Sequence, residues 1–155
     1  MPENNFIRLS PITQEQFAEI SEYFFRYMQE IAGQELLTRE HCHVFINAVM
    51  SNPKRELFWA IKEEKPCGFI FMSIEKNWPI LETSKAKINE FYIFPEMRRQ
   101  KCGKHLLEEI THYLSGRNCD SIELEVHFNN SAGYLFWQAM GFEIKKHVLH
   151  KPLEP

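Results

Sequence analysis

The stretch INEFYIFPEMRRQKCGKHLL, residues 88–107, decides the fold, because a strand pattern passes through a cationic turn into a helix pattern. Pro95 ends the strand pattern, since proline cannot donate to a strand ladder. After the turn, apolar residues recur at helical spacing up to Gly116: Leu106, Leu107, Ile110, Tyr113 and Leu114. The sequence therefore predicts a strand, a turn and a helix in direct succession.

The turn is a candidate anion site. It carries Arg98, Arg99, Lys101 and Lys104 around Gly103, and no Ser, Thr, Asp or Asn lies between Pro95 and Gly103 to cap the helix. Unpaired N–H groups and the positive end of the helix dipole favour a phosphate there, and glycine lets the backbone approach it. An ordinary charged surface turn is the alternative interpretation.

A nucleotide P-loop does not fit the same residues. Arg98 stands where the first glycine of that motif belongs, and His105 follows Gly103-Lys104 where serine or threonine is required. The glycines of a dinucleotide fingerprint are missing as well.

Composition bounds the class of protein. A chain of 155 residues, 44% apolar and 25% charged, predicts one globular domain over residues 1–155. A net charge of -3 argues against a nucleic-acid partner. No apolar run approaches the roughly 18 residues of a membrane span, and the N-terminus lacks a signal-peptide core. Four cysteines without metal-like or disulfide-like spacing indicate a reducing, cytoplasmic compartment and no metal.

The other elements follow from capping signals, periodicity and breakers. One helix is expected after the Thr13/Gln16 capping-box pattern, a second from Thr38 to Asn52, and a short one that stops at Gly141. Pro66 and Gly68 are expected to mark the turn end of a hairpin. The expected strands are residues 6–11, 56–62, 67–75, 86–94, 121–126 and 143–150. This order predicts an α/β class, with an α+β mixed sheet.

Taken in order, these segments resemble the GNAT acetyltransferase superfamily. That family's phosphate loop reads Arg/Gln-x-x-Gly-x-Gly/Ala; Arg98 and Gly103 match its first and last positions, and Lys101 replaces the middle glycine. Its late pattern, N-x-x-A-x-x-x-Y-x-x-x-G-F, is matched through Asn130, Gly141 and Phe142, with Gly133 and Trp137 at the positions of the usual alanine and tyrosine. The resemblance covers residues 88–142.

The resemblance implies a central mixed sheet with flanking helices, in which strands 86–94 and 121–126 are parallel and splay apart for the pantetheine arm of acetyl-CoA. The backbone of Phe91, Tyr92 and Ile93 would pair with that arm. Asn130 would cap its helix or also reach the cofactor, and Trp137 would pack on the CoA arm or in the core. Backbone N–H groups would hold the pyrophosphate over Arg98, Arg99, Gln100, Lys101, Cys102, Gly103 and Lys104.

The implied activity is direct, acetyl-CoA-dependent transfer of an acetyl group to a primary amine, in a small molecule or a peptide. Glu90 is the candidate base, with a solvent-facing strand glutamate as the equal alternative. Tyr92 is a candidate acid for the CoA thiolate. A catalytically silent CoA-binding sensor or interaction module on the same fold is the alternative function, and a homodimer is left open. Glu123 and Glu125, on one strand face, would attract a cationic acceptor or form a solvated face.

Overall fold

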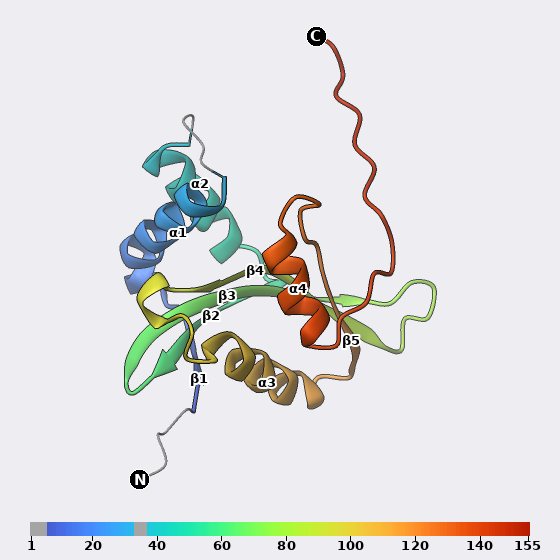
Figure 1. The fold of residues 1–155 in the computed structure, drawn as a ribbon, viewed down its shortest axis with the longest axis horizontal. Coiled ribbons are helices and arrows are strands. Elements are labelled where there is room, and N and C mark those ends of the chain that lie inside the picture. The colour runs from blue at the N-terminus through green and yellow to red at the C-terminus, as the bar shows by residue number, and fades with distance from the viewer. Residues whose placement is uncertain (1–5, 33–36) are drawn as a thin grey trace. The chain divides into compact units, whose positions relative to one another are not determined.

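The computed structural model describes residues 6–32 and 37–155. The chain divides into two compact units, residues 1–125 and residues 126–155, and each is described by itself (Figure 1). The first unit contains a five-stranded sheet with its helices, and the second contains the helix α4 (Ser131–Ala139). The single domain expected over residues 1–155 stays a prediction.

The sheet confirms the mixed class that the sequence predicts. Its strand order is β1-β2-β3-β4-β5, with antiparallel pairing up to β4 and parallel pairing between β4 and β5. The parallel pair needs a crossover, which the helix α3 supplies. The strands are β1 (Arg8–Pro11), β2 (Arg55–Lys62), β3 (Lys65–Lys76), β4 (Ser84–Ile93) and β5 (Cys119–Leu124).

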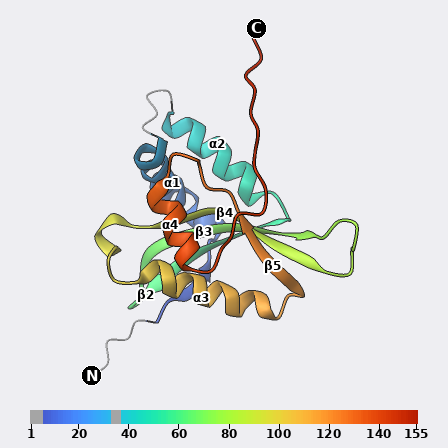
Figure 2. The same ribbon diagram turned by 45° about the vertical axis from the view of Figure 1, so that its right-hand side comes forward.

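Helices cover both faces of this sheet. Figures 1 and 2 show α1 (Phe17–Ala32) and α2 (Arg39–Met50) on one face and α3 (Cys102–Ser115) on the other. Two short 3₁₀ turns, Gln14–Gln16 and Pro95–Met97, precede α1 and α3. Among the described helices, none combines the length and the apolar character needed to cross a bilayer.

The alternation of β3 separates the two halves of the core. Phe69 and Phe71 belong to the cluster that packs against α1 and α2, so Ile70 and Met72 face the α3 side. The cluster beneath α1 and α2 also contains Leu57, Trp59, Ile61, Tyr92 and Phe94 from the sheet, and Ile20, Phe24, Tyr27, Cys42, Ile46 and Val49 from the helices.

The two N-terminal helices both begin with capping bonds, of which the sequence predicts the box at Thr13 and Gln16 and, for the second helix, the start at Thr38. The Gln16 side chain accepts a hydrogen bond from the backbone N–H of Thr13, at 2.9 Å. At α2, the Thr38 hydroxyl accepts from the N–H of His41, and Nδ1 of His41 accepts from the N–H of Thr38, both at 3.1 Å. Reciprocal bonds of this kind satisfy donors that a helix leaves unpaired.

Gly68 does not mark a turn. The β2–β3 turn is made by Glu63 and Glu64, which both have positive φ angles of 51° and 65°. Gly68 lies inside β3, where an added Cβ would stand 2.1 Å from the carbonyl oxygen of Tyr92. The glycine therefore permits the close approach of β3 to β4.

The strand predicted at residues 143–150 is wrong. Within residues 126–155, all of which the structure describes, α4 is followed by a segment without regular secondary structure. Ile144, Val148 and Leu149 are exposed on it. A strand needs a neighbouring strand to pair its backbone groups, and none of the strand pairs includes this segment.

Candidate active site

The ladder between the parallel strands ends part-way along β4. The pairs run from Ser84 with Cys119 to Ile88 with Leu124, whereas β4 continues to Ile93. On its other side β4 stays paired with β3 as far as Ile93, which lies opposite Gly68. Residues 89–93 therefore lie beyond the last β4–β5 pair, which is the divergence that the resemblance implies.

A β-bulge at Asn89 sets the face on which Glu90 lies. Ile88 is opposite Met72 and Glu90 is opposite Phe71, so Asn89 is the extra residue in β4. In a regular strand, Ile88 and Glu90 would share a face. The bulge breaks this alternation and turns Glu90 toward α1, the side on which Phe71 packs.

Two hydrogen bonds join this part of β4 to α1. The Tyr27 hydroxyl donates to Oε2 of Glu90 at 2.7 Å, and the Tyr92 hydroxyl donates to Oε2 of Glu30 at 2.5 Å. Tyr27 and Glu30 are three residues apart in α1, a spacing that brings side chains together on one helix face. Glu90 and Tyr92 therefore share the α1 face of β4, as their spacing predicts.

The surroundings of Glu90 disfavour the ionised form of its carboxyl group. Burial raises its pKa above the ordinary value for glutamate. The hydrogen bond from Tyr27 and the positive charge of Arg55 act in the opposite direction without cancelling burial. A raised pKa is the property that makes a glutamate an effective proton acceptor near neutral pH.

Glu30 is in the opposite state. Its burial would raise the pKa, but hydrogen bonds from Arg98 and Tyr92, together with the charge of Arg98, outweigh burial and lower it. The ion pair joins Nη1 of Arg98 to Oε1 of Glu30 at 2.5 Å. Arg98 thus holds Glu30 ionised.

Tyr92 keeps its proton. Its side chain is buried, and burial and the bond to Glu30 raise the pKa of its hydroxyl. A tyrosine with a raised pKa is a weaker acid than free tyrosine, and a free thiol has a pKa of only about 8.5. The role of Tyr92 as acid for the CoA thiolate stays a prediction. In this structure its hydroxyl is a hydrogen-bond donor to Glu30.

The backbone of the predicted phosphate loop is sharply turned. Arg99 and Lys101 have φ angles of 61° and 60°, and α3 begins directly afterwards at Cys102. Lys101 precedes the helix in the left-handed conformation and provides no side-chain cap. Glycine enters this conformation without strain, which accounts for the glycine that the family motif carries where this chain has Lys101.

The side chains of the loop point in several directions. The guanidinium of Arg98 turns to Glu30, donates from Nε to the carbonyl of Ile93 at 3.1 Å and lies over the Tyr92 ring, 5.4 Å from its centroid. Gln100 accepts a hydrogen bond from Lys62 at 3.0 Å. Besides Arg98, the exposed cationic side chains of the loop are Arg99, Lys101 and Lys104, beside the buried Cys102 and the half-buried Gly103.

The second unit contains the late motif. Asn130 caps α4, since its Oδ1 accepts from the N–H of Gly133 at 3.0 Å. A Cβ at Gly133 would lie 2.5 Å from the Asn130 amide nitrogen, so an alanine at this position would require the Asn130 side chain to shift. The Trp137 ring packs on Phe136 and Phe142, with centroids 4.9 and 5.2 Å apart. Contacts of Asn130 and Trp137 with a cofactor stay predictions.

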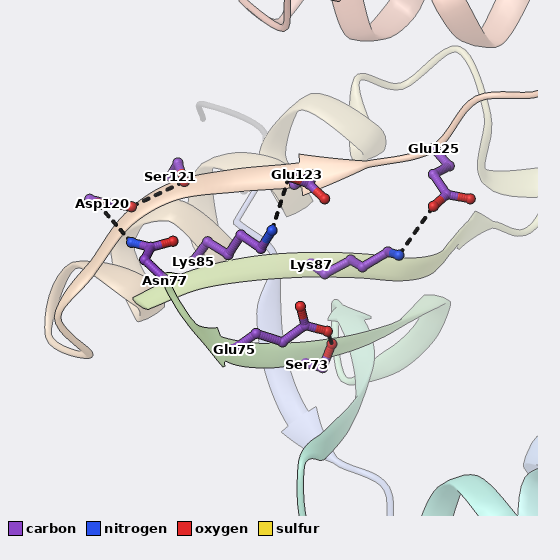
Figure 3. A network of polar contacts seen from close by, with 9 residues as sticks. All are labelled: Ser73, Glu75, Asn77, Lys85, Lys87, Asp120, Ser121, Glu123 and Glu125. Carbon is purple, nitrogen blue, oxygen red and sulfur yellow. Dashed lines mark hydrogen bonds and ion pairs between the residues drawn. The ribbon is translucent and has the colours of Figure 1, made fainter. Parts of the chain in front are cut away.

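Glu123 and Glu125 lie in a row of ion pairs across β4 and β5. Figure 3 shows the side chains of Lys85 and Lys87 directed at these two carboxylates, at 3.3 and 3.2 Å. The two glutamates share a face, as predicted, and each has a lysine partner. Their charge is therefore compensated within the sheet, and a cationic acceptor would compete with these lysines.

The contacts of α1 are the part of the site that the sequence does not reveal. From the sequence, Tyr27 is expected on the apolar face of the first helix and in the aromatic wall of the acceptor site, and Glu30 is not singled out. The one available signal is the i, i+3 placement of a tyrosine and a glutamate on a helix, which is too common to be specific. Among the described residues, no group of three or more His, Cys, Asp or Glu side chains is placed to hold a metal ion.

Comparison with known proteins finds relatives that are similar in sequence to this chain. A curated relative, spermidine N(1)-acetyltransferase of Thermoplasma acidophilum, is 28% identical over 124 residues, which are 80% of this chain and 70% of the relative. An uncharacterized N-acetyltransferase of Methanocaldococcus jannaschii is 22% identical over 139 residues, which are 88% of this chain and 61% of the relative.

A solved structure shows the same fold at low identity. It is that of a possible acetyltransferase from Clostridium difficile 630, with a TM-score of 0.81, 14% identity and coverage of 97% of this chain and 99% of the other. The model of the acetyltransferase (GNAT) family matches residues 9–142, which include β2 to β5, all of β1 but its first residue, and the four α-helices of the described chain. The chain belongs to the GNAT family of acetyltransferases.

Proposed function

We propose that this acetyltransferase uses acetyl-CoA and transfers the acetyl group directly to a primary amine. The observation that carries the proposal is the pairing of two features on β4. The strand leaves β5 beyond Ile88, and the next side chain turned toward α1 is Glu90, a buried carboxylate with a raised pKa.

The residues present fit acetyl-CoA. The α3 N-terminus has no side-chain cap, and exposed cations surround it, so its N–H groups suit a pyrophosphate. The backbone of Phe91, Tyr92 and Ile93 would hold the pantetheine arm, and residues 98–104 would hold the phosphates. The thioester supplies an already activated acyl group, so positioning accounts for much of the rate.

Glu90 addresses the main obstacle, which is the proton on the acceptor. A primary amine with a pKa near about 10.4 is almost wholly protonated at neutral pH. Glu90 would accept that proton directly or through water, and backbone N–H groups of β4 would stabilise the oxyanion. Negative charge at Glu90 also favours the approach of an ammonium group.

The test measures the release of CoA from acetyl-CoA in the presence of each amine of a panel, with every assay at the same pH. Spermidine is the first acceptor to include, because the curated relative is named for it; aminoglycosides, amino acids and short peptides complete the panel. We expect acetyl-CoA, but not ATP, to raise the melting temperature, since a ligand at about 100 times its Kd adds roughly 2.7 kcal/mol. Binding without turnover of any amine would favour the silent CoA-binding module, and the absence of binding would contradict both functions.

A further inference from the structure

The phenolic oxygen that contacts Glu90 is fixed from several sides. Tyr27 is only 8% exposed, and its ring lies 5.6 Å from Phe69, 4.8 Å from Tyr92 and 5.8 Å from Phe24, measured between centroids. These rings leave the hydroxyl little freedom, and it donates to Oε2 of Glu90 at 2.7 Å. The contact joins α1 to the strand residue that directly follows the bulge.

We propose that Tyr27 is a positioning residue for acetyl transfer: its hydroxyl holds Oε2 of the Glu90 carboxylate and leaves Oε1 to take the acceptor's proton. This inference rests on the proposed function of Glu90 as base. One fixed oxygen limits the rotation of the carboxylate, so the other oxygen presents a single direction to the amine.

The hydrogen bond also keeps Glu90 available as a base. It stabilises the charged form and thereby opposes the effect of burial on the pKa of Glu90. The groups that act on Glu90 electrostatically are Tyr27 from α1 and Arg55 from β2, while β3 presents the apolar Phe71 opposite to it. Tyr27 is therefore the one direct bond donor among them.

The chain offers a matched control for this bond. On the other side of the sheet, the Tyr113 hydroxyl of α3 donates to Oε1 of Glu56 of β2 at 2.6 Å. This is also a helix-to-strand bond from tyrosine to glutamate. Tyr113→Phe thus removes the same chemical interaction away from β4.

The experiment compares Tyr27→Phe and Tyr113→Phe with the unmodified chain. The titration of the Glu90 carboxyl group is followed by ¹³C NMR in protein labelled at glutamate, and the signal that is missing in Glu90→Gln is assigned to Glu90. Tyr27→Phe keeps the ring, so the packing around it is retained. We expect the Glu90 titration to move to higher pH in Tyr27→Phe and to stay in place in Tyr113→Phe. An unmoved Glu90 signal in Tyr27→Phe would overturn the inference, and this measurement needs no acceptor.

Kinetics with acetyl-CoA and spermidine provide the second readout. Because the ratio of variant to unmodified kcat/KM cancels the acceptor's own titration, we expect Tyr27→Phe to be about 10-fold slower at pH 7. It should recover part of this loss at pH 9, where ionisation of Glu90 no longer limits the variant and the lost orientation remains. A kcat/KM at pH 7 no lower than that of Tyr113→Phe would overturn the inference. Failure of the unmodified chain to transfer acetyl to any panel amine would instead contradict the proposed function.

Discussion

Two tyrosine–glutamate hydrogen bonds connect α1 with β4, and they leave their carboxylates in opposite states. At one, helix residue Tyr27 donates to strand residue Glu90, whose pKa is raised. At the other, strand residue Tyr92 donates to helix residue Glu30, whose pKa is lowered. The bonds are chemically alike, so the hydrogen bond alone does not decide the state of the carboxylate.

The difference lies in the cation. Glu30 has a direct ion pair with Arg98 of the phosphate loop, whereas Glu90 has only the charge of Arg55 acting without a direct bond. An ion pair favours the charged carboxylate, and burial without one favours the neutral form. The comparison supports the proposal that Glu30 anchors the loop against α1 and that Glu90 takes a proton.

The largest effect is expected at Glu90. Glu90→Gln keeps an oxygen that can accept from Tyr27 but removes the charge, so kcat/KM for a panel amine should fall by about 100-fold or more. Acetyl-CoA binding should change little, and the variant's rate should keep rising with pH toward the acceptor's own pKa. Glu123→Gln, which removes a charge from the neighbouring strand, should stay within about threefold. An unaltered pH–rate profile in Glu90→Gln would remove this residue from the mechanism.

A smaller effect is expected at the anchored end. Arg98→Met removes the ion pair with Glu30 and the bond to the Ile93 carbonyl, so the phosphate loop loses its attachment to α1. We expect the KM for acetyl-CoA to rise by about 10-fold with kcat nearly unchanged, the pattern of lost uniform binding. Arg117→Met, which removes an ion pair with Glu56 outside this loop, is the control. If kcat fell and KM did not, Arg98 would act on the reacting atoms instead.

The tyrosines should also differ. Tyr92→Phe removes a bond from a carboxylate that keeps its Arg98 partner, so turnover should fall by less than about threefold, a smaller loss than in Tyr27→Phe. Steady-state rates of the two variants at pH 7 make the comparison. A loss of about 100-fold in kcat with Tyr92→Phe would assign the thiolate's acid to this hydroxyl.

The smallest expected effects are on the free energy of unfolding, which Glu30→Gln and Glu90→Gln should change in opposite directions. The folded pKa of Glu30 is lowered, so its ionised form stabilises the folded state above the ordinary pKa of about 4.3, and this stability is lost as pH falls through the folded pKa. The folded pKa of Glu90 is raised, so ionisation destabilises the folded state as pH rises past the ordinary value.

At pH 7 we therefore expect Glu30→Gln to lower the free energy of unfolding and Glu90→Gln to raise it, each by about 1 kcal/mol or less. Near pH 4 the Glu90→Gln difference should vanish, because both forms are then neutral, while the Glu30→Gln difference should persist. Urea unfolding at the two pH values gives these quantities. If both variants changed the free energy of unfolding in the same direction at pH 7, the contrast between Glu30 and Glu90 would be wrong.

Most of the sheet and the loop could be predicted from the sequence, because they depend on local signals. Pro95 and Gly116 bound the central segment, and the absence of a capping side chain before α3 is visible in the residues themselves. The parting of β4 and β5 came from the resemblance. The segment at residues 143–150 failed because its apolar residues alone do not supply a strand partner.

The contacts of the site could not be predicted, because they join distant parts of the chain. The bonds from Tyr27 to Glu90 and from Tyr92 to Glu30 span 63 and 62 residues. Which side chains meet over such a separation depends on the strand register and on the rotation of α1. Neither is encoded in the spacing of Glu90 and Tyr92 along β4.

The bulge at Asn89 lets β4 contain one residue more than the opposite stretch of β3 while Glu90 stays on the α1 face. Substitution of Asn89 would keep the count, whereas deletion of this one residue would restore regular alternation. Glu90 would then follow Ile88 directly, and because adjacent strand residues face opposite sides, Glu90 and Tyr92 would stay on the α1 side. In an alignment or an engineered variant, a single-residue gap between Ile88 and Glu90 would therefore remove the bulge and still leave Glu90 on the side of Tyr27.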